Sequence, residues 1–276
     1  MAIAKAEFRA LLNLHRDRIP RKLRRPAPPW ALGRDYAKRL KKITTSAANM
    51  LITKLWPVLE AMARTDGVKL DADAEDVGKT IDKIEADFWK RWTRERMADL
   101  VRPTAEEVPR FQAQAGNAVL RPVVGVDVLG SEPWLDEAAR GFVTRNVALI
   151  KTIPQRMFDE VEQMVTAEVS QGARWEDLRD RIRERFGVSE SRARLIARDQ
   201  TNKFYAELSR TRHESLGITK EIWRTQNDNR VRDEHEALEG EEYSISRPPL
   251  GGPGHPVGCR CYGEPVLPSA LEAAED

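Results

Sequence analysis

Residues 224–265 read RTQNDNRVRDEHEALEGEEYSISRPPLGGPGHPVGCRCYGEP, and their composition sets them apart from the rest of the chain. They contain both cysteines of the protein, Cys259 and Cys261, and two of its four histidines, His235 and His255. Charged side chains come first, a loop rich in proline and glycine follows, and a Cys-Arg-Cys step closes the stretch. Such residue types gather where a metal ion, a catalytic site or a stapled loop requires them.

The cysteines are separated by one residue, which argues against a disulfide between them. The small ring would be strained and would close almost no loop, so we expect free thiols or metal ligands. Zn²⁺ in a structural site takes four Cys or His ligands, and His255, Cys259 and Cys261 would supply three, with His235 as the fourth. The alternative is that the histidines form ordinary hydrogen bonds and the cysteines simply pack. Zinc is the one cofactor that the sequence suggests.

A catalytic interpretation of the same stretch is a second alternative. Asp228, His235 and His255 include general-base types, so a metal-dependent, nuclease-like hydrolase can be written with them. Nothing in their spacing sets a mutual geometry, and the chain has no nucleophile motif, P-loop or dinucleotide fingerprint. We therefore expect a protein that is not an enzyme.

Composition indicates a soluble protein with a helix-rich surface. The chain has 276 residues, of which 33% are charged, and this length allows one or two domains. No apolar run approaches the roughly 18 residues that a membrane-spanning helix needs. The first residues lack the apolar core of a signal peptide. We expect a protein without a membrane span that is made and kept in a cytosol-like compartment.

Residues 1–32 form a basic arm, although the net charge of the chain is only +2. Prolines between residues 20 and 29 exclude a continuous helix and favour an extended strap, which lies across another surface or stays disordered. The charge suits the phosphates of double-stranded DNA or an acidic protein surface, and a solvated, mobile tail is the alternative. The candidate contact residues are Arg16, Arg18, Arg21, Lys22, Arg24 and Arg25.

Residues 33–172 are predicted to form a helical domain. Apolar residues recur at three- and four-residue steps, and the helices that this pattern predicts are Arg34–Arg64, Ala74–Val101, Pro133–Ile150 and Pro154–Gln171. Pro57 is expected to end or kink the first helix, and the Asp66-Gly67 turn to pair the first two as an antiparallel hairpin. Residues 102–131 are less regular, and for their valine-rich stretch AVLRPVVGVDVLG the pattern does not decide between a short strand pair and a packed loop.

Residues 173–268 are predicted to mix helix and strand. We expect a helix from Trp175 to Phe186 stopped by Gly187, and a long helix from Ser189 to Leu216 stopped by Gly217. The later elements are a strand at residues 218–226, a short helix at Val231–Leu238, and short strands at EEYSIS and CYGEPVL. The predicted fold class is mainly α with a small α+β C-terminal module, followed by an acidic tail at residues 269–276.

Between about residue 175 and about residue 267 the chain carries an ordered series of motifs: ARLIARDQTNKFYAELSRTRHESLGI, IWRTQND, N-R-V-R-x-x-H-x-x-L-x-G, G-H-P and C-R-C-Y-x-E-P. In this series the chain resembles the phage head-morphogenesis family, whose members include protein F of phage Mu and the portal-associated minor head protein of SPP1-like phages. This chain departs from relatives that carry more residues between the His-Pro step and the first cysteine. The family pattern falls on Asp199, Thr201, Asn202, Trp223, Asp228, Arg230, Arg232, His235, Gly240, His255, Pro256, Cys259, Arg260 and Cys261.

The resemblance implies a minor capsid protein of a tailed phage or prophage, present in few copies inside the head near the portal vertex. It implies a role in head assembly, and further in genome packaging or ejection. The partners that it implies are the portal protein, then the major capsid or scaffolding protein, and packaged double-stranded DNA reached through the basic arm. Assembly would take place in the host cytoplasm.

Overall fold

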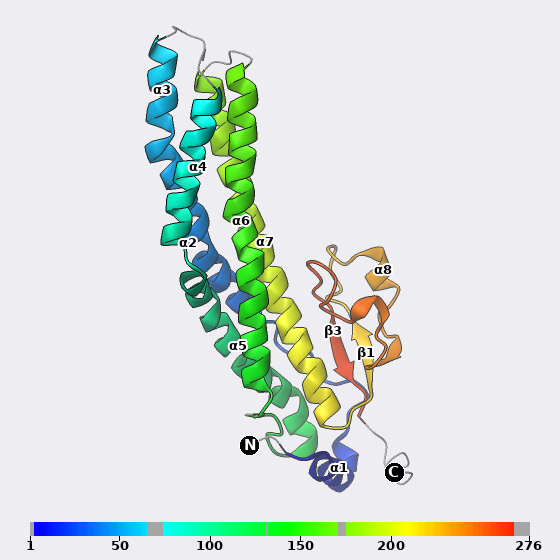
Figure 1. Cartoon of the computed structure of the whole chain (residues 1–276). Helices are drawn as coiled ribbons and strands as arrows, with labels where there is room; N and C mark the ends of the chain where they lie inside the picture. The colour runs from blue at the N-terminus through cyan, green and yellow to red at the C-terminus, as the bar shows by residue number, and fades with distance from the viewer. Residues whose placement is uncertain (1–2, 66–73, 131, 171–174, 268–276) are drawn as a thin grey trace. The chain divides into compact units, whose positions relative to one another are not determined.

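The computed structural model describes residues 3–65, 74–130, 132–170 and 175–267. It confirms a mainly helical chain that ends in a small α+β module (Figure 1). The predicted Asp66-Gly67 turn and the acidic tail at 269–276 lie outside the described residues. None of the helices in the described part is long and apolar enough to cross a membrane.

The helices and strands follow one another in a simple order along the chain. The helical elements are α1 (Lys5–Leu14), the short 3-10 helix η1 (Arg16–Arg18), α2 (Trp30–Lys54), α3 (Trp56–Thr65), α4 (Ala74–Arg91), α5 (Arg94–Val124), α6 (Leu135–Ser170), α7 (Trp175–Ser215), α8 (Asp233–Glu236) and the 3-10 helix η2 (Pro249–Gly251). The strands are β1 (Lys220–Arg224), β2 (Glu242–Ser244) and β3 (Tyr262–Pro265).

The chain forms two compact units, each built from segments that are distant in sequence. The bundle unit takes Arg34–Arg102 and Val143–Ala197. The sheet unit takes its described residues from Met1–Gly33, Pro103–Phe142 and Arg198–Asp276. Helices α5, α6 and α7 therefore contribute residues to both units. The division at residues 32, 172 and 268 that the sequence suggests stays a prediction.

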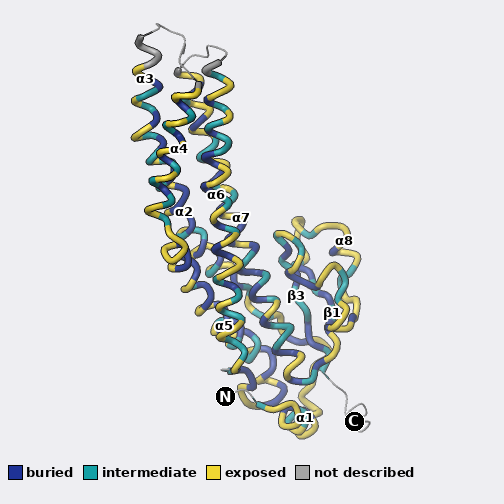
Figure 2. The backbone as a smooth tube through the Cα atoms, viewed as in Figure 1, coloured by how far each residue is buried: buried dark blue, intermediate teal, exposed yellow. Residues whose placement is uncertain are grey.

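The bundle unit is held by apolar stripes at helical spacing. On α2, the side chains of Leu40, Ile43, Ala47 and Leu51 are completely buried, as the periodicity predicts. The buried stripes are visible along each helix in Figure 2. Phe88 of α4 meets Phe158 of α6 edge to face, with ring centroids 5.3 Å apart.

Two of the predicted helix ends in the bundle unit can be checked directly. Pro57 does interrupt the first predicted helix, because α2 ends at Lys54 and α3 starts at Trp56. The prediction of one helix over Ala74–Val101 is wrong, since α4 ends at Arg91 and α5 starts at Arg94. Thr93 accounts for the new start, because its Oγ1 accepts a hydrogen bond from the backbone N–H of Arg96 at 3.3 Å and so caps the helix.

Two predicted breaks are absent. The helices expected at Pro133–Ile150 and Pro154–Gln171 are one helix, α6, with Pro154 inside it. The stop at Gly187 is also wrong, because α7 runs without interruption from Trp175 to Ser215. A glycine inside a helix costs only about 1 kcal/mol. The helix has a buried face on both sides of the glycine, at Ile182 before it and at Ser189 and Ala193 after it, so packing outweighs that cost.

Most of residues 102–131 is helical, because α5 extends to Val124 with three prolines inside it. A strand pair is therefore wrong for this segment, and a loop is right only after Val124. Its valine-rich end keeps helical spacing, since Val119, Leu120, Val123 and Val124 are all buried. The loop that follows is held by Asn117, whose side-chain amide accepts from the backbone of Val128 at 3.0 Å and Leu129 at 2.9 Å. Burial on one face of α5 therefore makes this stretch helical, although its local preferences for helix and strand are ambiguous.

The C-terminal elements agree with the predictions. α7 ends at Ser215, and Gly217 follows with a φ of +79°, a conformation that favours glycine and closes the helix in a Schellman-type turn. The strands form a three-stranded antiparallel sheet in the order β2-β1-β3. In it, Glu221 of β1 lies opposite Tyr243 of β2 and Pro265 of β3.

The basic arm is not a free tail, so that alternative is wrong. Its first part forms α1, whose Phe8 and Leu12 are buried in one apolar cluster with the end of α5 and with Ile218 and Ile245. Residues 19–29 are irregular, as the prolines predict. They lie against the sheet, because the N–H of Leu23 donates to Glu264 Oε1 at 3.0 Å.

Arg212 of α7 is the most deeply buried charge in the sheet unit. Its side chain is completely buried, and Nε and Nη2 donate to the two carboxylate oxygens of Glu132 at 2.8 and 2.9 Å. Nη1 donates to the carbonyl oxygen of Pro109 at 3.0 Å and also to Gln112. One guanidinium thus joins α7, α5 and the segment before α6.

We expect Arg212→Met to destabilise the protein by about 3–5 kcal/mol, because it leaves the Glu132 carboxylate buried without its partner. The free energy of unfolding in urea measures this loss. Arg194→Met is the matched control, since Arg194 is exposed on the same helix and its ion pair with Glu190 is worth at most about 1 kcal/mol. A loss no larger than the control's would contradict the assignment, and Glu132→Leu should recover part of it in the double variant.

Candidate metal centre

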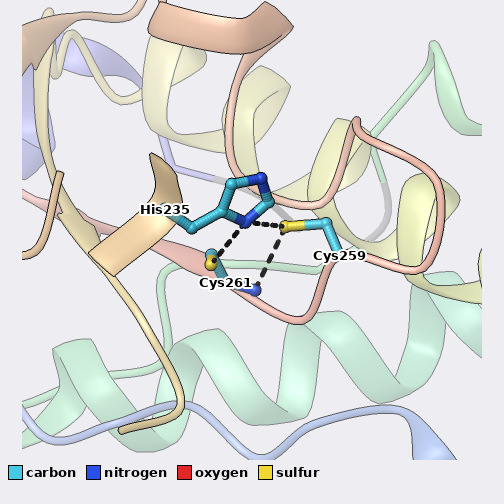
Figure 3. A group of neighbouring side chains, drawn as sticks. All are labelled: His235, Cys259 and Cys261. Carbon is cyan, nitrogen blue, oxygen red and sulfur yellow. Dashed lines mark hydrogen bonds between the residues drawn. The ribbon is translucent and has the colours of Figure 1, made fainter. Parts of the chain in front are cut away.

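His235, Cys259 and Cys261 meet in the small module (Figure 3). His235 lies on α8, and the cysteines lie in the loop that leads into β3. Nδ1 of His235 is 3.6 Å from Sγ of Cys259 and 3.5 Å from Sγ of Cys261. All three side chains are buried, and both cysteines are free thiols. The group has the residue types and the spacing of a site for one metal ion.

The Cys259 sulfur is surrounded by hydrogen-bond donors. Its Sγ accepts from the backbone N–H of Gly254 at 3.3 Å and of Cys261 at 3.4 Å. The hydrogen bond from the Cys261 thiol, followed by these backbone donors and the charge of His235, lowers the pKa of Cys259 to about 6 although burial opposes the shift. The hydrogen bond that the Cys261 thiol makes with Cys259, followed by burial, raises the pKa of Cys261. The pair therefore has one thiolate ready for a cation.

His255 does not belong to this group, so the four predicted ligands become three. It is exposed, and its ring lies beside Gly251. Gly251, Gly252 and Gly254 all have positive φ, which favours glycine, so the loop before Cys259 follows a path that other residues would not adopt readily. The backbone N–H of His255 donates to Gly252 O at 3.1 Å, which closes the turn.

The cysteine loop is fixed to α7 by family-motif residues. The N–H of Gly258 donates to Asp199 Oδ1 at 2.7 Å, and Asn202 Nδ2 donates to the carbonyl oxygen of Cys259 at 3.3 Å. Gly254 approaches the helix so closely that a Cβ there would lie 2.6 Å from that of Ala206. The sequence motif on α7 therefore positions the two sulfurs.

Asp228 and Arg260 form an ion pair. Arg260 Nη1 donates to Asp228 Oδ2 at 2.7 Å, and Nη2 to Oδ1. This bond with Arg260 lowers the pKa of the exposed Asp228 carboxyl. The hydrolase alternative uses Asp228, His235 and His255. In the structure Asp228 belongs to an ion pair, His235 to a buried cluster and His255 to an exposed loop.

The remaining motif residues shape the module around His235. Trp223 is completely buried and meets the His235 ring edge to face at 5.6 Å between centroids. Arg232 places Nη1 3.5 Å from Nε2 of His235, and its other terminal nitrogen donates to the carbonyl oxygen of Val257. Of the other motif residues, Thr201 is buried on α7 and Arg230 is exposed beside Asp228. The backbone N–H of Gly240 donates to the carbonyl oxygen of Trp223, and the carbonyl oxygen of Pro256 accepts from the backbone N–H of Cys259.

The six candidate contact residues of the arm are all exposed: Arg16, Arg18, Arg21, Lys22, Arg24 and Arg25. Only Arg25 among them has a described aromatic contact, with its guanidinium 5.8 Å from the ring centroid of Tyr262. The arm therefore presents these charges to solvent while Phe8, Leu12 and Leu23 are buried.

The fold and site define a mainly helical protein with a small α+β module built around a buried His-Cys-Cys group. Residues 159–263 match the family described as Phage Mu protein F like protein, which confirms the resemblance over this part of the chain.

An uncharacterized protein of Haemophilus influenzae is 35% identical over 153 residues, which cover 54% of this chain. The matched residues span about a third, 34%, of the length of that relative. No solved structure matches the chain.

A second buried polar group lies beside the sheet and was not singled out from the sequence. Glu221 of β1 accepts from His213 Nδ1 at 2.6 Å and from the hydroxyl of Tyr243. All three side chains are buried. The alternation around Trp223 does predict that every second residue of β1 points inward, but it does not pair a carboxylate with a histidine on α7.

We expect this group to make stability sensitive to acid. Burial acts to raise the pKa of Glu221, but His213, Tyr243 and the charge of Arg210 together lower it below the ordinary value of 4.5. A lowered pKa stabilises the fold above the unfolded value, and that contribution is lost as the pH falls through the folded value.

Glu221→Gln should therefore cost about 1–3 kcal/mol at neutral pH and should lose less stability than wild type between about pH 5.5 and about pH 3. Urea unfolding at several pH values measures both. The exposed Glu241, changed to Gln, is the control and should follow the wild-type curve. An unchanged acid slope in Glu221→Gln would show that the carboxylate is not the group responsible.

Proposed function

We propose that this protein is a minor capsid component of a tailed phage or prophage, acting in head assembly from a position inside the head at the portal vertex. The observation that carries the proposal is the Mu F-like domain at residues 159–263. The further roles that we propose, in genome packaging or ejection, rest on the same family likeness together with the exposed basic arm.

The proposal of a structural rather than an enzymatic role is supported by how the motif residues are used. Asp199 and Asn202 form hydrogen bonds with the backbone of the cysteine loop. Arg232 donates to the carbonyl oxygen of Val257, and Arg260 donates to the carboxylate of Asp228. Side chains that a hydrolase would aim at substrate here make bonds within the module. Packing groups of this kind stabilise a surface through which a protein can bind its partners.

The basic arm is the part that we propose to contact the portal protein or packaged DNA. Phe8, Leu12 and Leu23 are buried in one apolar cluster, so the six exposed basic side chains at residues 16–25 belong to a segment that is packed at both of these places. Binding to phosphates or to an acidic protein surface would weaken steeply with salt.

The test is co-expression of the full chain with the portal protein of the same phage or prophage. We expect co-purification of the two at low salt, and at least a tenfold weaker association when the arm is neutralised by changing Arg16, Arg18, Arg21, Lys22 and Arg24 to Gln. Arg25 is left unchanged because it contacts Tyr262.

A control variant changes the same number of exposed basic residues on α2 and α4 to Gln: Lys38, Lys42, Lys83, Lys90 and Arg91. An equal loss in this control would mean that net charge, not the arm, drives association. No association with the portal at low salt would contradict the proposed location. DNA cleavage by the purified chain that disappears in His235→Ala would instead establish the hydrolase and overturn the structural role.

A further inference from the structure

We propose that His235 Nδ1, Cys259 Sγ and Cys261 Sγ bind one Zn²⁺ ion, with a water molecule from the adjoining cavity as the fourth ligand. The inference concerns the small module alone and does not depend on the proposed role in the phage head. Its role would be to cross-link α8 to the cysteine loop.

The distances between the donor atoms fit a tetrahedral ion. With Zn–N of about 2.0–2.1 Å and Zn–S of about 2.3 Å, adjacent ligand atoms lie about 3.5 Å apart. The two N···S separations in the protein are 3.6 and 3.5 Å, and all three donor atoms lie within 4.8 Å of one another. The side chains therefore need little movement to accept the ion.

The donor set selects zinc among the common metals. Two sulfurs and an imidazole are soft or borderline ligands, which Mg²⁺ and Ca²⁺ do not favour. Iron–sulfur clusters usually use four cysteines, and blue-copper sites use two histidines with one cysteine. Zinc binds mixed Cys and His sets in either structural or catalytic sites.

The surroundings of the three ligands favour the bound form. The backbone N–H groups of Gly254 and Cys261 point at the Cys259 sulfur and stabilise its thiolate. With Nδ1 bound to the metal, Nε2 of His235 would carry its proton. Glu234 Oε1 lies 3.6 Å and Arg232 Nη1 3.5 Å from that nitrogen, so a small shift of the exposed Glu234 side chain would supply the carboxylate partner that metal-binding histidines usually have.

The fourth position opens on a small cavity. Besides the three ligands, the cavity is lined by polar side chains that include Gln226, Arg230, Arg232 and Arg260. Asp228, which approaches this region, is already paired with Arg260. Solvent is therefore the ligand that reaches the ion most directly, since the three protein donors occupy its buried side.

A bound ion would also replace part of a core that is small. The apolar cluster around the site consists of Trp223, Tyr243, Cys259 and Cys261, with Leu238 packed against it. The ion would join residues 24 and 26 positions apart in sequence. Cross-linking of this kind stabilises modules whose apolar burial is insufficient alone.

The test uses the full chain, purified under reducing conditions without chelator. We expect about one zinc per chain by elemental analysis, and X-ray absorption at the zinc edge with two sulfurs at about 2.3 Å and two lighter atoms at about 2.0–2.1 Å. Removal of the ion with a chelator should lower the melting temperature by several degrees, and added zinc should restore it.

Variants identify the ligands. The double variant Cys259→Ser, Cys261→Ser should hold no zinc, and its melting temperature should not respond to chelator. His255→Gln is the matched control in the same loop and should keep its zinc, because His255 is exposed and outside the group. Helical circular dichroism reports whether the double variant still folds.

The proposal is overturned if folded, reduced wild-type protein supplied with zinc binds none, or if another metal is found in its place. It is also overturned if the absorption spectrum shows no sulfur, or if His255→Gln loses the ion. These measurements need no portal protein, so their failure is distinct from failure of the proposed function. The X-ray absorption and chelator experiments use wild-type protein and stand even if the double variant does not fold.

Discussion

The hydrogen bond from the backbone of Gly258 to Asp199 ties the cysteine loop to helix α7 and sets the position of everything around it. It is 2.7 Å long and has a carboxylate as acceptor, which makes it one of the stronger kinds of hydrogen bond. Asn202, one turn further along α7, holds the loop at a second point, because its Nδ2 donates to the carbonyl oxygen of Cys259. With the loop held at these two points, both sulfurs lie within 3.6 Å of His235 Nδ1.

Buried charges organise the rest of the sheet unit. Arg212 joins α7 to Glu132 and to α5, and Glu264 of β3 accepts both Leu23 N–H from the arm and Arg224 Nε from β1. Each buried charge costs free energy to desolvate, so each is satisfied by several partners. Because these partners come from distant segments, they hold the arm, the sheet and α7 in one arrangement rather than only adding stability.

The sequence predicted helix faces and ligand types well but misplaced several boundaries. Tyr36, Leu40 and Ile43 are buried as the periodicity indicates, and the strands around Trp223 form as expected. Local rules predict breaks at Gly187 and Pro154, but both residues lie inside helices. Their local cost is about 1 kcal/mol for glycine and about 3 kcal/mol for proline, which a continuous buried face can outweigh. Local rules carry no information about that face when it is formed by distant segments.

The sequence by itself determined the mainly helical class, the small α+β module, the family likeness and the presence of metal-binding residue types in one stretch. Only the tertiary structure decided that His235 joins the cysteines and that His255 does not. The physical reason is that ligand distances depend on the path of the loop. That path follows from the positive φ of Gly251, Gly252 and Gly254 and from the anchors on α7, contacts that join positions as much as 59 residues apart.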